Sequence, residues 1–99
     1  MSLYDLIINK RTEIIEIATL HGAENVRLFG SVARLEDDDK SDIDFLIDLP
    51  SDLSRLSPWF PVLLIRDLEN LLHRKVDVAI ASDLNPRIKD RVLQKAISI

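Results

Sequence analysis

Hydrophobic positions recur along this chain with two alternating spacings, which predict alternating helices and strands. Residues 3–20 carry apolar side chains three or four positions apart, and Gly22 follows the last of them, so we expect one amphipathic helix there. Residues 26–29 are a short apolar run and predict a first strand. Residues 31–35 could form a brief helix, and the charged residues 36–40 predict a loop.

The alternation is clearest over residues 42–49, which predict a second strand. Side chains two apart in a strand share one face. One face would carry Ile43, Phe45, Ile47 and Leu49, and the other Asp42, Asp44, Leu46 and Asp48.

The second half of the chain continues the pattern. Ser57 followed by Pro58 predicts the start of a helix that runs to about Leu72. Residues 76–80 predict a third strand, and Asn85 with Pro86 predicts a last helix whose apolar stripe reaches Ile97. The order predicts a small two-layer α/β fold, with a mixed three-stranded sheet, helices packed on one face and the other face left to solvent.

Composition narrows the classes of protein that fit. The 99 residues suit one domain spanning 1–99, and 46% hydrophobic residues suffice for one core. Seventeen acidic and thirteen basic residues give a net charge of −4, which argues against direct binding to nucleic acid. Cysteine is absent, which excludes disulfides and thiolate metal sites. Unbroken apolar runs are short, so we expect no membrane span and a cytoplasmic protein.

The acidic side chains of the two later strands form a candidate metal site. Asp42 and Asp44 would point the same way, with Cα atoms about 6.5–7 Å apart. Asp77 would lie beside them if the third strand neighbours the second. Carboxylate oxygens prefer Mg²⁺ or Mn²⁺, and two such ions can bridge an in-line displacement at phosphorus.

The turn that follows the first strand is a candidate phosphate site. Glycine at position 30 lets a phosphate approach the backbone closely, and Ser31 can add N–H and hydroxyl donors. Arg34 could face the same phosphates. A Gly-Ser pair, an Asp-x-Asp strand or an exposed Asp77 is common by itself, but the three in this order are far more specific and favour nucleotidyl transfer.

These residues resemble the motif of the minimal nucleotidyltransferases of the DNA polymerase beta superfamily. That motif reads Gly-Ser-x-Ala-Arg-Gly, a short loop, Ser-Asp-x-Asp and a third aspartate on a later strand. The chain matches it with Gly30, Ser31, Ala33, Arg34, Ser41, Asp42, Asp44 and Asp77. Leu35 stands where the family usually has glycine, and it would carry a backbone cost if that position needs a positive φ.

The resemblance implies roles for these residues. Asp42, Asp44 and Asp77 would be the catalytic residues and would hold two Mg²⁺ or Mn²⁺ ions, with Asp77 helping to activate the attacking hydroxyl. Gly30 and Ser31 would hold the triphosphate of ATP, joined in nucleotide binding by Arg34 and Ser41.

Chains of this size resemble the antitoxin of HEPN–MNT toxin–antitoxin systems. The resemblance implies a hetero-oligomer with a HEPN-domain ribonuclease toxin, and transfer of AMP from ATP to a tyrosine of that toxin. The alternative is a catalytically weak or inactive antitoxin that neutralises the toxin by stoichiometric binding. A small-molecule nucleotidyltransferase is the third reading, although the chain lacks a second domain to build its pocket.

Overall fold

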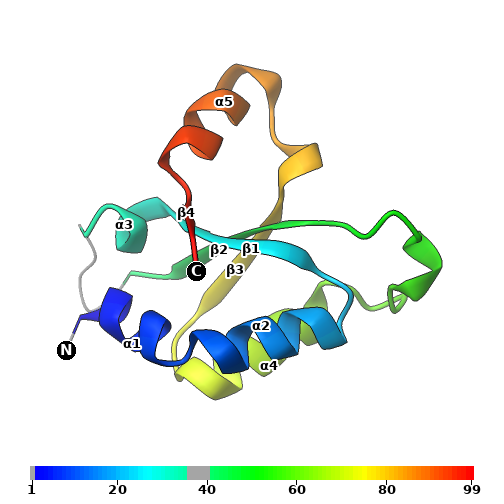
Figure 1. The fold of residues 1–99 in the computed structure, drawn as a ribbon, viewed down its shortest axis with the longest axis horizontal. Helices are drawn as coiled ribbons and strands as arrows, with labels where there is room; N and C mark the ends of the chain where they lie inside the picture. Colours follow the sequence, from blue (N-terminus) through cyan, green and yellow to red (C-terminus); the bar gives the residue numbers. More distant parts are fainter. Residues whose placement is uncertain (1, 36–40) are drawn as a thin grey trace.

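A mixed four-stranded sheet, ordered β3-β2-β1-β4, forms the centre of the computed structural model, which describes residues 2–35 and 41–99 (Figure 1). Strand β2 is parallel to β3 and antiparallel to β1, and β1 is antiparallel to β4. In chain order the elements are α1 (Leu3–Asn9), α2 (Arg11–Leu20), β1 (Glu24–Phe29), α3 (Gly30–Ala33), β2 (Ile43–Asp48), the 3₁₀ turn η1 (Leu53–Arg55), α4 (Val62–Leu72), β3 (Val76–Ile80), the 3₁₀ turn η2 (Ala81–Asp83), α5 (Pro86–Lys95) and β4 (Ile97–Ser98).

The fourth strand corrects the prediction of a three-stranded sheet. Helix α5 begins at Pro86 as expected, with the Asn85 side chain accepting a hydrogen bond from the Arg87 N–H at 2.9 Å, but it ends at Lys95. Ala96 is extended, and the next two residues pair with Arg27 and Leu28 of β1. The free edge of β1 offers unpaired backbone groups, and a tertiary partner of this kind outweighs the apolar spacing that suggested a longer helix.

The N-terminal segment forms two helices instead of one. The Ser2 hydroxyl accepts a hydrogen bond from the Asp5 N–H at 3.1 Å and caps α1. The helical path breaks at Lys10, whose φ and ψ are −105° and 13°. No proline or glycine marks this break, so packing decides it, with Ile7 and Ile14 both fully buried in the core.

Helix α4 starts later than Ser57 and Pro58 predict. The Ser57 hydroxyl accepts a hydrogen bond from the Trp59 N–H at 3.1 Å, which makes a local turn, and the helix begins at Val62 with Pro61 as its N-cap. Proline disfavours helical geometry in the residue before it and lacks an N–H donor. A helix therefore cannot run through Phe60 and Pro61.

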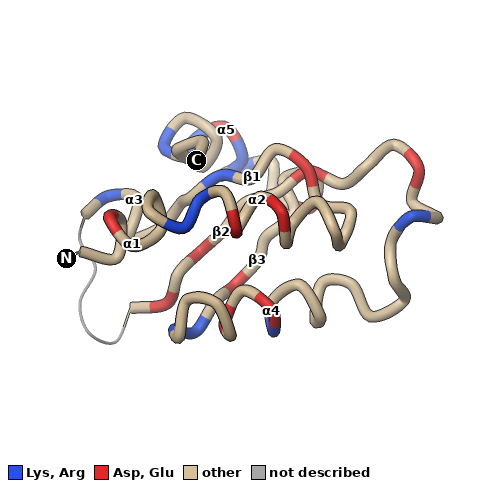
Figure 2. The backbone as a smooth tube through the Cα atoms, turned by 60° about the horizontal axis from the view of Figure 1, so that its bottom comes forward, with Lys and Arg blue, Asp and Glu red and all other residues tan. Residues whose placement is uncertain are grey.

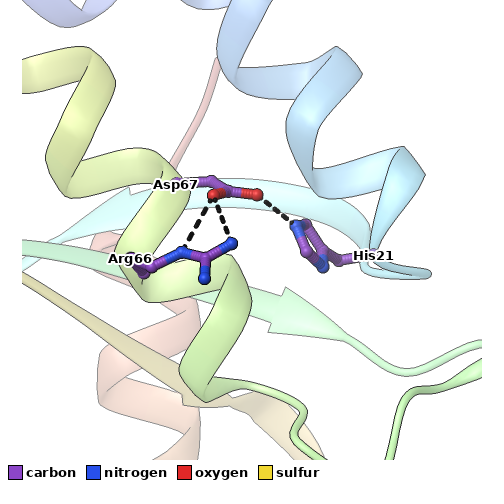
Figure 3. A network of polar contacts seen from close by, with 3 residues as sticks. All are labelled: His21, Arg66 and Asp67. Carbon is purple, nitrogen blue, oxygen red and sulfur yellow. Dashed lines mark hydrogen bonds and ion pairs between the residues drawn. The ribbon is translucent and has the colours of Figure 1, made fainter.

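The main core lies between the sheet and helices α1, α2 and α4, which Figure 1 shows together on one side. Strand β2 contributes the fully buried Ile43 and Phe45 and the almost fully buried Ile47, as the alternation predicts. Between the C-terminal end of α2 and the middle of α4, His21 Nε2 lies 2.7 Å from Asp67 Oδ2, and Arg66 contacts the other carboxylate oxygen (Figure 3). This polar contact joins the two helices beside the core.

The opposite face of the sheet is only partly open to solvent, which corrects the expectation for that face. Helix α5 lies on this side in Figure 1. Leu46, which alternates with the core residues of β2, is 0% exposed. The same face carries Asp44 and Asp48, so the acidic residues share it with a covered apolar position. The described residues include no helix long and apolar enough to cross a membrane.

Candidate active site

Two of the three predicted carboxylates stand directly opposite each other on neighbouring strands. Asp44 of β2 and Asp77 of β3 are register partners in the parallel pair, where strands lie about 4.8 Å apart. Asp42 comes immediately before β2 begins at Ile43, whose N–H donates to the Lys75 carbonyl at 2.9 Å. The expectation that the third strand neighbours the second is confirmed, and it brings the three carboxylates to one region of the sheet.

The electrostatics of this region single out Asp44. Partial burial raises the pKa of its carboxyl group, the negative charges of Asp77 and then Asp42 raise it further, and the Arg34 guanidinium partly opposes them. A carboxyl group in this position gains from a nearby cation, because the cation relieves the repulsion that burial strengthens. Asp42 is half-buried and Asp77 is exposed.

Gly30 lies against the carboxylate of Asp44. Strand β1 ends at Phe29, which is the register partner of Asp44, so the chain turns immediately beside that side chain. Gly30 has a φ of +77°, and a Cβ atom added there would overlap Asp44 Oδ2. Position 30 therefore needs glycine for two reasons, the backbone conformation and the close approach.

The remaining predicted residues lie on the two segments that flank this contact. Ser31 lies in α3 and is half-buried. Arg34 ends α3 and is close enough to Asp44 to influence its pKa. Ser41 is half-buried, and its carbonyl accepts a hydrogen bond from Arg74 Nη2 at 2.8 Å. The predicted loop 36–40 lies outside the described residues.

Leu35 occupies the position where the resemblance anticipates glycine, and its backbone has the conformation that glycine favours. Its φ is +58°, and its side chain is 68% exposed. Left-handed geometry costs an L-residue about 1–2 kcal/mol, and an exposed leucine recovers little of this through burial. Position 35 thus has a positive φ although leucine stands there.

The carboxylate oxygens of Asp42, Asp44 and Asp77 suit a divalent cation that substrate phosphates also coordinate. Among residues 2–35 and 41–99, no three His, Cys, Asp or Glu side chains are grouped closely enough to surround one ion. Mg²⁺ is commonly held by one or two carboxylates, waters and substrate phosphates together, so a complete protein cage is not needed. The repulsion that raises the pKa of Asp44 marks where such an ion would be most stabilising.

A small cavity that the sequence pattern did not reveal adjoins the turn. It has a volume of about 130 Å³ and is lined by Phe29, Gly30, Arg34, Arg91, Val92 and Lys95. Its far wall comes from α5, which was expected only as a packing helix. The sequence signal was the basic character of 86–95, with four Lys or Arg residues and one Asp, in a chain of net charge −4.

Other charged groups on the sheet have structural partners. Although burial opposes it, hydrogen bonds from Asn25 and Arg27 hold the pKa of Asp48 below its usual range. The distance from Arg27 Nη2 to Asp48 Oδ1 is 2.7 Å. His73 takes a left-handed conformation at the end of α4, and His21 binds Asp67. A larger cavity of about 300 Å³ lies at the other end of β1, around Glu24 and Asn25.

Comparisons with known proteins agree with this arrangement. Residues 8–99 match the family model described as polymerase beta, nucleotidyltransferase. A protein of Methanocaldococcus jannaschii, provisionally named protein adenylyltransferase MJ0435, is 36% identical over 89 residues, which are 90% of this chain and 92% of that protein.

Solved structures extend the likeness to the whole fold. A structure provisionally described as a minimal nucleotidyltransferase is 33% identical and superimposes with a TM-score of 0.85, covering 100% of this chain and 97% of that one. A toxin–antitoxin structure with AMP-PNP has a TM-score of 0.71 at 19% identity, covering 88% of this chain and 69% of that one. The toxin–antitoxin MntA–HpeT mutant has a TM-score of 0.67 at 17% identity, covering 86% and 67%.

The first structure supports relationship as well as shape, whereas the two toxin–antitoxin structures establish likeness of fold alone. The family match covers nearly the whole chain and includes all four strands and the Gly30 turn. The chain belongs to the polymerase beta family of nucleotidyltransferases and is a nucleotidyltransferase.

Proposed function

We propose that this nucleotidyltransferase is an antitoxin that transfers AMP from ATP to a tyrosine hydroxyl of a HEPN-domain ribonuclease toxin. The observation that carries the nucleotidyl-transfer part is the cluster around Asp44, with Asp77 across the strand pair and Gly30 against the carboxylate. The name of the Methanocaldococcus jannaschii relative supports a protein acceptor. The two toxin–antitoxin neighbours, one of them with AMP-PNP, support a toxin partner and ATP as the donor.

In the proposed reaction, an acceptor oxygen attacks the α-phosphorus of ATP. A new oxygen–phosphorus bond forms, the bond to the oxygen bridging the α- and β-phosphorus breaks, and pyrophosphate leaves. Asp42 and Asp44 would hold two Mg²⁺ ions, and Asp77 would complete the site and help to activate the acceptor hydroxyl. Bound Mg²⁺ supplies stabilisation of the negative charge that develops on the transferring and leaving groups.

The residues beside the carboxylates would position the nucleotide. Gly30 and Ser31 would hold the triphosphate through the backbone N–H groups of the turn, whose left-handed conformation glycine permits. Arg34 would lie between the carboxylates and the phosphates, as its effect on the pKa of Asp44 suggests. Ser41, two residues before β2, would also contribute to nucleotide binding.

The test is transfer of label to a HEPN toxin in the presence of Mg²⁺. ATP labelled on the α-phosphate should label the toxin, whereas ATP labelled on the γ-phosphate should not. A toxin with the modified tyrosine replaced by phenylalanine should stay unlabelled. Absence of transfer from α-labelled ATP to an accessible toxin would contradict the proposal.

Stoichiometric neutralisation is a second candidate function, and the positive φ of Leu35 is the observation that favours it. A strained residue beside the phosphate turn would weaken nucleotide binding without affecting a protein interface. This function predicts that toxin inhibition needs equimolar chain and no ATP. Inhibition by a small fraction of one equivalent, only with ATP, would exclude it.

A further inference from the structure

We propose that Arg91 and Lys95 of α5 form the second wall of the nucleotide site and bind the β- and γ-phosphates of the nucleoside triphosphate. This inference rests on the proposed nucleotidyl transfer and deepens it, because it assigns the distal phosphates to a helix outside the recognised motif. The cavity of about 130 Å³ joins the two walls, with Gly30 and Arg34 on one side and Arg91 and Lys95 on the other.

The size of the cavity limits what can occupy it. Pockets that enclose a whole nucleotide-sized ligand have volumes of about 300–1,000 Å³, so this cavity holds only part of such a ligand. Gly30 lines the cavity and also lies against the Asp44 carboxylate, so the cavity adjoins the carboxylate region. The part of the substrate that enters it is therefore adjacent to the phosphorus that reacts.

The charges around the cavity decide which part of the substrate fits. Three of its six lining residues are cationic, namely Arg34, Arg91 and Lys95, and none is acidic. Arg91 and Lys95 are four residues apart on α5, so they lie one above the other on the same side of the helix. Charge-assisted hydrogen bonds from such groups suit phosphate oxygens, and Arg can bind phosphate in a bidentate manner.

Helix α5 is well placed for this role because it follows one edge strand and precedes the other. It starts after β3 and η2 and ends at β4, and β3 and β4 are the outermost strands of the sheet. In Figures 1 and 2 it lies on the side away from α2 and α4. Figure 2 also shows basic positions on α5 and acidic positions on β2 and β3. The helix has no fully buried residue, so its side chains are available to a ligand.

Equilibrium binding to the full chain tests the assignment without an acceptor. ATP, ADP, AMP, adenosine and inorganic tripolyphosphate should be titrated by calorimetry with Mg²⁺ present. Arg91→Ala and Lys95→Ala should each weaken ATP and tripolyphosphate by about tenfold, and should change AMP and adenosine by less than about twofold. Arg87→Ala and Lys89→Ala remove the same charges from the same helix outside the cavity, and should weaken ATP by less than about threefold.

The competing outcomes are distinct. Equal weakening of ATP, AMP and adenosine would place the base, not the distal phosphates, against α5 and would overturn the inference. Equal effects of the cavity variants and the two controls would also overturn it, because they would indicate a diffuse charge effect. If the phosphate-selective loss occurs but no AMP reaches the toxin, the inference stands and the proposed acceptor fails. If the wild-type chain binds no triphosphate, both fail.

Discussion

Asp44 and Asp77 face each other across the parallel pair β2 and β3, one residue on each strand. Parallel pairing sets their separation through the backbone, so the repulsion between them does not depend on a loop. Asp44 is partly buried, and its pKa is raised by burial first and by Asp77 and Asp42 next. Without a bound cation, the ionised form of Asp44 is therefore disfavoured.

Replacing Asp44 with Asn should therefore stabilise the metal-free protein while abolishing transfer. Since the folded state raises the pKa of Asp44 above its ordinary value of 3.8, the destabilisation from ionising it is absent below pH 3.8 and complete above the raised pKa. In EDTA at pH 7.5 we expect a gain of a few tenths to about 1 kcal/mol in the free energy of unfolding. Transfer activity should fall by at least about 100-fold.

Asp48→Asn is the matched control, because Asp48 lies on the same strand and its pKa is lowered. The stability that its ionised form contributes is present above pH 3.8 and is lost as the pH falls through its lowered pKa, so this variant should be destabilised at pH 7.5. Denaturation curves of both variants at pH 4 and 7.5 measure whether each substitution raises or lowers the free energy of unfolding. A destabilised Asp44→Asn at pH 7.5 would refute the proposed repulsion.

Divalent metal should raise the melting temperature of the wild-type chain. A cation that binds only the folded state at ten times its Kd stabilises by about 1.4 kcal/mol. Asp44→Asn should blunt this shift. Because Asp44 retains its proton to a higher pH than an ordinary aspartate, the shift produced by Mn²⁺ should begin to decline at a correspondingly higher pH on acidification. Thermal scans with millimolar Mn²⁺ at several pH values provide the measurement, and an unchanged melting temperature at pH 7.5 would count against a metal site.

Gly30→Ala should damage both stability and catalysis. The φ of +77° and the contact with Asp44 oppose a Cβ atom, so we expect a loss of at least about 1–2 kcal/mol. Gly22→Ala is the control, since Gly22 has a φ of +88° and a Cβ atom there would meet Leu56, far from the carboxylates along β1. Both variants should melt at lower temperatures, but only Gly30→Ala should lower kcat/KM in the fraction that remains folded.

Leu35→Gly should stabilise the chain. Relief of the left-handed leucine is worth about 1 kcal/mol, which corresponds to about 4–8 °C in Tm for a chain of this size. Leu20→Gly provides the contrast, because Leu20 is similarly exposed but helical, and glycine there should lower Tm. A rise in ATP affinity of Leu35→Gly together with the rise in Tm would link the strain to the phosphate turn. A lower Tm for Leu35→Gly than for wild type would contradict this account.

The sequence predicted best where a local signal and the tertiary contacts agree. Strand β3 has the predicted bounds Val76–Ile80, and α5 begins at the predicted Pro86 with Asn85 as its cap. The two-residue spacing of Asp42 and Asp44 placed them near each other, and Asp77 lies beside Asp44 because β3 neighbours β2, the condition on which that prediction depended. The bounds of β3, the start of α5 and the spacing of Asp42 and Asp44 each depend on a periodicity or a helix cap within a few residues of sequence.

What the sequence could not predict depends on contacts between distant segments. Strand β4 needs the free edge of β1, and the break at Lys10 follows from how Ile7 and Ile14 pack. The late start of α4 reflects a competition between the cap at Ser57 and Pro61, which makes the first turn of this helix ambiguous in the sequence. The cavity at Arg91 requires knowing that α5 returns over the carboxylate side of the sheet, which no pattern within 86–95 specifies.

The position of α5 between the two outermost strands has a consequence for how this enzyme could change. Asp44 stands on β2, the most deeply buried strand, where substitutions disturb the core. The outer wall of the site is a helix with no fully buried residue, so residues on it can be exchanged at little cost in stability. Core packing therefore restricts changes around the carboxylate of Asp44. The residues of α5 are less restricted, so the preference for a particular donor or leaving group can evolve there.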